Sequence, residues 1–120
     1  MMVPLIQSLL QGDSEVRRVL GDPIRVYPST APQDTELPYA TWQAVGGSPL
    51  GVLSERPPAD GWRVRIAVWG GDSGQANEAA LAVRDAIEAV GSIESFNPPP
   101  DDDDTGAFGI SFDVRLLQIR

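Results

Sequence analysis

The sequence of 120 residues contains no cysteine, no histidine and no lysine, and all nine of its basic residues are arginine. Without cysteine or histidine, the chain lacks the usual ligands of zinc and iron–sulfur sites and cannot form a disulfide framework. The nucleophile and the base of most hydrolase triads are missing for the same reason. We therefore expect no enzyme activity, no catalytic residue, no cofactor and no metal.

The sequence also lacks a long apolar run, because its stretches of hydrophobic residues are only a few residues long. A membrane-spanning helix needs about 20 such residues in succession. The first four residues, Met1 to Pro4, do not have the basic start and the apolar middle of a signal peptide. We expect a protein that is made in the cytoplasm and has no membrane partner.

Acidic residues outnumber basic ones by 17 to nine, which gives a formal net charge of -8. Nucleic-acid binding in general needs clustered basic residues that displace counterions from phosphates, so this charge argues against it. Hydrophobic residues make up 42% of the chain and charged residues 22%, which is typical of a folded globular domain. Because we find neither a repeat nor a linker, we expect residues 1–120 to form a single domain.

The spacing of apolar residues predicts the order of the secondary structure. Two short helices are expected in the first 20 residues, the second of them capped by Asp13 or Ser14. A longer helix begins at the cap Asp72, with Gln75 completing a capping box, and ends before Gly91. Strands are expected at residues 24–27, 39–45, 62–69, 93–96 and 108–117. The order α-α-β-β-β-α-β-β predicts an α+β fold, a small antiparallel or mixed sheet of four to five strands with helices packed on one face.

The same periodicity selects residues for one hydrophobic core. Its expected members come from the third strand, the long helix and the last strand: Val64, Ile66, Val83, Ile87, Phe108, Ile110 and Phe112.

Two long loops are expected. Residues 46–61 contain three prolines and four glycines, with Leu50, Val52 and Leu53 among them, and loops of this length usually have a function. We expect this loop, which also contains Arg56, to contact a partner. Residues 97–106 combine Pro98–Pro100 with Asp101–Asp104 and should form a stiff, acidic, exposed loop.

Three patterns that could mark a binding or catalytic site have simpler interpretations. Asp101–Asp104 lacks the twelfth-position carboxylate of a calcium-binding loop, since that position is Phe112, so we interpret it as a solvated turn. Residues 70–74 follow a strand and open a helix, where phosphates can bind, but they lack a phosphate-binding motif and favour a helix entry turn. Asp85 and Glu88 are interpreted as surface residues.

Arg63, Arg65 and Trp69 lie out of phase with the apolar face of their strand. If this strand neighbours the last one in antiparallel fashion, the arginines can pair with Asp113, which shares its face with Arg115. The alternative is a role of the arginines between subunits. Trp69 should lie either under a helix or in an interface.

One stretch is distinctive. Residues 27–42 read YPSTAPQDTELPYATW, and they are followed by RVRIAVW at 63–69, ANEAALAVRDAI at 76–87 and ISFDV at 110–114. In this order, these segments resemble the tail-completion, or tail terminator, proteins of long-tailed bacteriophages and prophages. The resemblance covers nearly the whole chain. The loop with Pro98 to Asp104 is the exception, because it does not resemble a feature of the family.

This resemblance implies a structural virion protein, a small α/β subunit that forms a ring, expected to be a hexamer, on top of the tail tube. The ring would cap the tube and join the tail to the head connector at the head-proximal end. Its partners would be further copies of itself, the tail tube protein and the connector protein, and DNA would pass through without specific binding. The interface with another subunit or the tube is expected to contain Leu50, Val52, Leu53, Arg56, Arg63, Arg65 and Trp69. The alternative is a small non-enzymatic adaptor that recognises a protein through residues 46–61.

Overall fold

The computed structural model describes residues 6–50, 59–89, 91–97 and 108–119. They form, in chain order, α1 (Ile6–Gln11), α2 (Ser14–Leu20), β1 (Val26–Pro28), β2 (Tyr39–Leu50), β3 (Ala59–Gly70), α3 (Ser73–Glu88), β4 (Gly91–Asn97) and β5 (Phe108–Ile119). The predicted order of elements and the α+β class are both confirmed.

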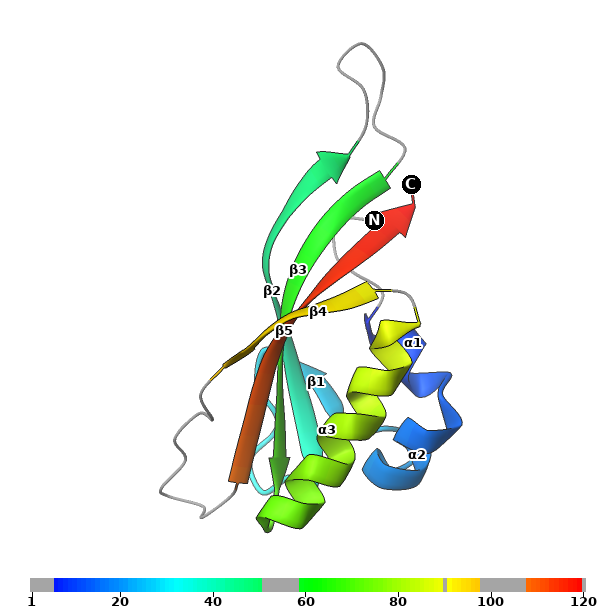
Figure 1. Ribbon diagram of the computed structural model, residues 1–120. Coiled ribbons are helices and arrows are strands. Elements are labelled where there is room, and N and C mark those ends of the chain that lie inside the picture. Colours follow the sequence, from blue (N-terminus) through cyan, green and yellow to red (C-terminus); the bar gives the residue numbers. More distant parts are fainter. Residues whose placement is uncertain (1–5, 51–58, 90, 98–107, 120) are drawn as a thin grey trace.

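The five strands form one mixed sheet in the order β1-β2-β3-β5-β4. β1 runs parallel to β2, and the other neighbours are antiparallel. A bulge interrupts the pairing of β2 between Ala44 and Gly46, and another interrupts β4 between Ile93 and Ser95. Figure 1 shows the helices packed on one face of this sheet, as the sequence predicted.

The core lies between this face and the helices. Every second residue of β3 points into it, so Val64 and Ile66 are fully buried. From α3, Val83 and Ile87 meet them, and β5 contributes Phe112 as the largest fully buried side chain of the described residues. The predicted core is therefore confirmed for these five residues.

The prediction is wrong for Phe108, which is 51% exposed. It is the first residue of β5 and pairs with Gly70, the last residue of β3, so the sheet ends beside it. Ile110, two residues further into the sheet, packs against the core but is only partly buried.

The start of α3 has the predicted cap in a modified form. Asp72 Oδ1 accepts a hydrogen bond from the Gln75 backbone N–H at 2.7 Å. Gln75 Oε1 in turn accepts from the N–H of Gly71 at 2.6 Å, and Gly71 is the residue before the cap. The helix begins directly against the end of β3, because a Cβ on Gly70 would lie 2.4 Å from the backbone nitrogen of Ala76.

Two expectations about chain breaks are wrong. Gly91 does not terminate α3 but begins β4, where a Cβ would lie 2.5 Å from the carbonyl oxygen of Arg115. The loop expected at 46–61 is shorter, because β2 continues to Leu50 and β3 begins at Ala59, with these two residues paired. Glycine and proline weaken the strand signal in this segment, but pairing with a long neighbouring strand overrides local propensity. Residues 51–58, and 98–106 of the expected acidic loop, lie outside the described residues.

Strand length distinguishes two halves of the sheet. β2, β3 and β5 each have 12 residues, which corresponds to about 40 Å of extended chain. α3 has 16 residues and is only about 24 Å long. The helices therefore cannot cover the whole sheet, and Figure 1 shows the ends of these three strands projecting beyond them. The principal-axis extents of 52 × 27 × 22 Å reflect this elongation.

Candidate interaction surfaces

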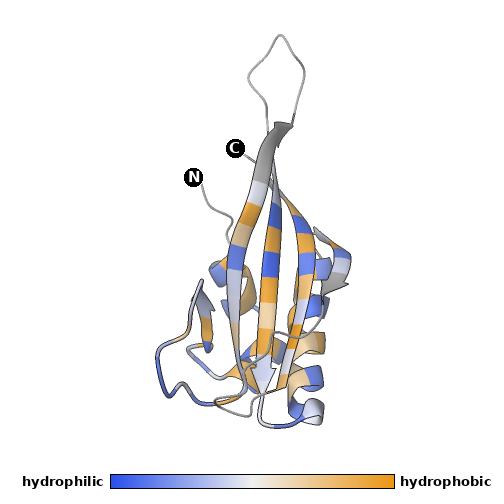
Figure 2. Cartoon of the chain, turned by 90° about the vertical axis from the view of Figure 1, so that its left-hand side faces the viewer, coloured by the Kyte–Doolittle hydropathy of each residue, from blue (hydrophilic) through white to orange (hydrophobic). Residues whose placement is uncertain are grey.

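The face of the sheet opposite the helices is charged. Figure 2 shows β2, β3 and β5 in front of the helices, with alternating hydrophilic and hydrophobic residues along the central strand. The hydrophilic residues of β3 here are Arg63 and Arg65, and β5 places Asp113 and Arg115 directly beside them. With Glu94 from β4, these five residues form what we call the arginine face.

Arg65 and Asp113 lie directly opposite each other on β3 and β5. Arg65 Nε donates to Asp113 Oδ1 at 3.0 Å, and a second contact joins Nη2 to Oδ2 at 3.3 Å. This hydrogen bond, reinforced by the carboxylate charge, raises the pKa of the Arg65 guanidinium above its ordinary value. The cross-strand pairing expected from the sequence is confirmed for this pair.

Arg63 and Arg115 also lie directly opposite each other, although they carry the same charge. Like charges in this position destabilise a sheet. Glu94 bridges them, since its Oε2 lies 3.1 Å from Arg63 Nε and its Oε1 lies 3.1 Å from Arg115 Nε. Glu94 lies in the β4 bulge, which breaks the alternation of the strand. For that reason the spacing in the sequence gave no signal for it.

The arginine face presents its positive groups outward. The side chains of Arg63, Arg65 and Arg115 are 56%, 51% and 68% exposed, whereas those of Glu94 and Asp113 are 27% and 11% exposed. Three arginines and two carboxylates give this surface a formal charge of +1, although the whole chain carries -8. The surface therefore differs in sign from the rest of the protein.

Trp69 lies on the same side of β3 as the arginines, next to Gly70, the last residue of the strand. It pairs directly with Tyr39 of β2, and the two ring centroids are 6.4 Å apart with an interplanar angle of 30°. The tryptophan is half-buried by this neighbour and does not lie under a helix. Its participation in an interface remains a prediction.

The other residues of the expected interface are only partly placed. Leu50 is the last residue of β2 and pairs with Ala59. Val52, Leu53 and Arg56 lie outside the described residues. The structure thus brings Arg63 and Arg65 together with Glu94, Asp113 and Arg115, and it leaves the grouping with residues 50–56 as a prediction.

The phosphate-binding and acid–base patterns considered in the sequence have structural roles or lie on the surface. The backbone N–H of Gly71, which could bind a phosphate, donates to Gln75, and Asp72 is the helix cap. Asp85 and Glu88 are both exposed, in line with their interpretation as surface residues. Within the described ranges, no group of three or more aspartate, glutamate, histidine or cysteine residues is arranged to hold a metal ion, and Asp101–Asp104 lies outside them. None of the described helices has the length and hydrophobicity needed to cross a lipid bilayer.

A sheet with helices on one face and an ion-paired, outward-facing arginine surface on the other defines a small α+β domain with surfaces suited to protein contacts. The profile of the family described as "Tail completion protein gp17" matches residues 4–98, and the chain belongs to this family. It is therefore a structural protein of a phage tail and a component of the virion. A search of curated proteins found no match.

Two solved structures share the fold. A chain from the "Virion of native gene transfer agent (GTA) particle" has a TM-score of 0.68 and 16% identity, with 96% of this chain and 92% of that chain covered. The "Structure of bacteriophage SPP1 gp17 protein" has a TM-score of 0.54 and 14% identity, with 96% and 86% covered. At these identities, the similarity concerns the fold alone.

Proposed function

We propose that copies of this chain form a ring that caps the phage tail tube at its head-proximal end and joins the tail to the head connector. Membership of the tail-completion family supports a role at this stage of assembly. The observation that carries the proposal is the projecting half of the sheet, where β2, β3 and β5 extend beyond the helices. In a monomer, the projecting strands bury little surface and therefore add little stability. In an assembly, a neighbouring chain can bury the same surface.

The outer edge of β2 supports assembly as well. β1 pairs only with Ala40–Trp42, so residues 43–50 of β2 have no strand partner on that side within the described part of the chain. An unpaired strand edge is a ready template for another chain. A contact between two different surfaces of identical subunits repeats around an axis and closes into a ring when the rotation allows it.

The surfaces for the neighbouring subunit and for the tail tube are proposed to include Leu50, Val52, Leu53, Arg56 and Trp69, with Arg63 and Arg65 of the arginine face. The last residue of β2, Leu50, and the first residue of β3, Ala59, lie at the projecting ends of these strands, where they are well placed to reach another protein. By resemblance to the family, six copies are expected. The net charge of -8 suits a passage for DNA, since an acidic surface does not retain phosphates.

The ring is tested by measuring the mass of the purified protein with light scattering and imaging it by negative-stain electron microscopy. We expect a closed ring several times the 12.9 kDa of one chain. Its role is tested in a phage or prophage that lacks the gene, which should make overlong or headless tails and regain normal ones on complementation. Normal tails of normal length in the deletion strain would contradict the proposal.

A further inference from the structure

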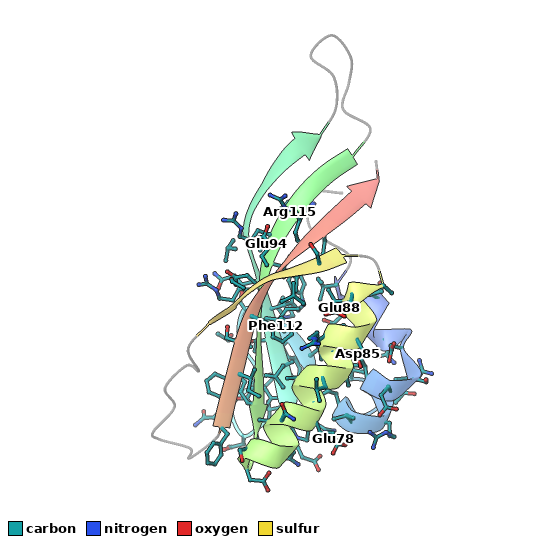
Figure 3. All side chains as sticks on the ribbon, viewed as in Figure 1. Glu78, Asp85, Glu88, Glu94, Phe112 and Arg115 are labelled. Carbon is teal, nitrogen blue, oxygen red and sulfur yellow. The ribbon has the colours of Figure 1, made fainter. Side chains whose placement is uncertain are left out.

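The outward side of α3 carries an acidic stripe. Glu78, Leu81, Asp85 and Glu88 are spaced by three, four and three residues, so they follow one another along a single side of the helix. Figure 3 shows the three labelled carboxylates along the length of α3. Leu81 lies between them with 43% exposure, and it is one of three large hydrophobic residues that are exposed in the described chain. We call these four residues the acidic stripe.

The carboxylates of the acidic stripe remain available for a contact. The Glu78 side chain is 58% exposed and meets Arg18 at 3.3 Å. Glu88, 45% exposed, lies 3.1 Å from Arg84 Nε in an ion pair without hydrogen-bond geometry. Asp85 is exposed and forms no ion pair within the described residues. The ion-pair partners on this side are Arg84, Arg18 and Glu15, which itself pairs with Arg18, and with them included the formal charge here is -2.

We propose that the arginine face of one copy binds the acidic stripe of the next copy, and that this is the repeating contact of the ring. The inference rests on the ring of the proposed function and names its interface. The two surfaces have opposite charge, and each presents its charged side chains outward. One lies on the uncovered sheet face and the other on the outer side of the helix layer, and they approach each other only at the edge strand β4, where Glu88 and Glu94 line the same pocket. When two copies bind in this way, one copy still has a free arginine face and the other a free acidic stripe. A third copy can therefore bind, and assembly continues until the ring closes.

The pairing also explains the internal ion pairs of the arginine face. Glu94 and Asp113 bind their arginines mainly through Nε, with one further contact from Nη2 of Arg65. These bonds hold the three side chains in place while leaving much of each guanidinium exposed. Side chains that are already ordered lose less conformational entropy when they bind a partner. Complementary charge would then orient the two copies and fix their register.

Nucleic acid is the competing ligand for exposed arginines, and the observations favour a second copy. The arginine face has a formal charge of only +1, because two of its five charged residues are acidic. Affinity for DNA depends on several uncompensated cations that displace counterions. The acidic stripe, by contrast, lies on every copy and supplies both the carboxylates and an exposed leucine.

The test reverses the charge on each surface separately and then on both. Arg63→Glu with Arg115→Glu reverses the arginine face, and Glu78→Arg with Asp85→Arg reverses the acidic stripe. Each double variant should lose the ring in light scattering and electron microscopy, while far-UV circular dichroism shows a folded chain. The chain with all four substitutions carries both reversals, so it should form the ring again. Glu36→Arg, at a side chain that is 80% exposed and lies on neither surface, is the control and should keep the ring.

The outcomes separate the ring from its interface. A monomeric wild-type protein would overturn both the ring and this contact. Rings that persist in both double variants, or a folded fourfold variant that stays monomeric, would overturn this contact alone. If a charge reversal unfolds the chain, the milder pair Arg63→Gln and Arg115→Gln replaces it, and unchanged assembly at limiting concentration would then contradict the proposal. Binding of a short duplex DNA at physiological salt that is lost in the arginine variants would assign this face to nucleic acid instead.

Discussion

On the face of the sheet that carries the helices, β3 contributes Val64, Ile66 and Val68, and all three are fully buried. On the other face, the same strand contributes Arg63 and Arg65, whose side chains are more than half exposed. Burial of apolar groups stabilises a domain by about 25 cal/mol per Å² of surface, whereas exposed ion pairs contribute roughly 0–1 kcal/mol. The covered face therefore stabilises the fold, and the uncovered face remains available for contacts with other proteins.

The covered face should respond most strongly to the loss of volume. Phe112→Ala removes the largest fully buried side chain of the described residues and leaves a cavity beneath α3. We expect a loss of about 3–5 kcal/mol in the free energy of unfolding, measured by urea denaturation. A loss below about 1 kcal/mol would mean that this site is not a packed core.

The same substitution, glycine to alanine, can be made at a crowded position and at an open one, and its effects on stability compared. Gly70→Ala would place a Cβ 2.4 Å from the Ala76 backbone nitrogen, so α3 must move away from the sheet. We expect a loss of about 2–3 kcal/mol by denaturant melting, as for overpacked sites. Gly46→Ala is the matched control on β2, because no other group lies within 4 Å of the place that its Cβ would take and its φ is not positive. Equal effects at the two sites would contradict the close contact of α3 with the end of β3.

The buried carboxylate of the arginine face should have an intermediate effect. Asp113 is 7% exposed and bonds to Arg65, so Asp113→Ala removes a charge-assisted contact. Because the arginine left behind can reach water, we expect a loss of only about 1–2 kcal/mol in thermal or urea melts. The control, Asp85→Ala on the exposed side of α3, should leave the stability unchanged. A loss as large as that of Phe112→Ala would show that this face contributes to the core.

The smallest effect is expected at the exposed bridge. Glu94→Gln weakens the ion pairs that separate Arg63 from Arg115, and the free energy of unfolding should fall by less than about 1 kcal/mol. The difference between wild type and variant should shrink in 1 M salt, where the Debye length is about 3 Å. A difference that does not depend on salt would contradict an electrostatic origin.

The sequence predicted those parts of the fold that have a regular period. The apolar stripe of α3 and the alternation of β3 and β5 located their elements and most of the core, and Asp72 marked the helix cap. Strand ends were harder to predict, because Gly46 and Pro49 lower strand propensity while pairing with β3 keeps them in β2. The same limit applies to Gly91, which begins a strand although glycine there is typical of a helix end.

The candidate surface could be predicted only in part. Arg63, Arg65 and Asp113 follow from strand alternation once β3 and β5 are assumed to be neighbours. Glu94 does not, because the bulge in β4 shifts its side chain out of phase and only the three-dimensional pairing brings it between two arginines. The exposure of Phe108 likewise depends on where the neighbouring strand ends.

The central claim is that the helix-covered face of the sheet folds the subunit, and that the surfaces left uncovered, which include the projecting ends of β2, β3 and β5, serve assembly. The most direct test is Leu50→Asp at the end of β2 combined with Leu53→Asp, with the melting temperature and tail completion measured on the same variant. A charge in a true core would unfold a domain whose whole stability is about 5–15 kcal/mol. We predict a folded subunit with a nearly unchanged melting temperature that fails to complete tails and gives overlong or headless ones. An unfolded variant, or a folded one that still completes tails, would contradict this division of roles.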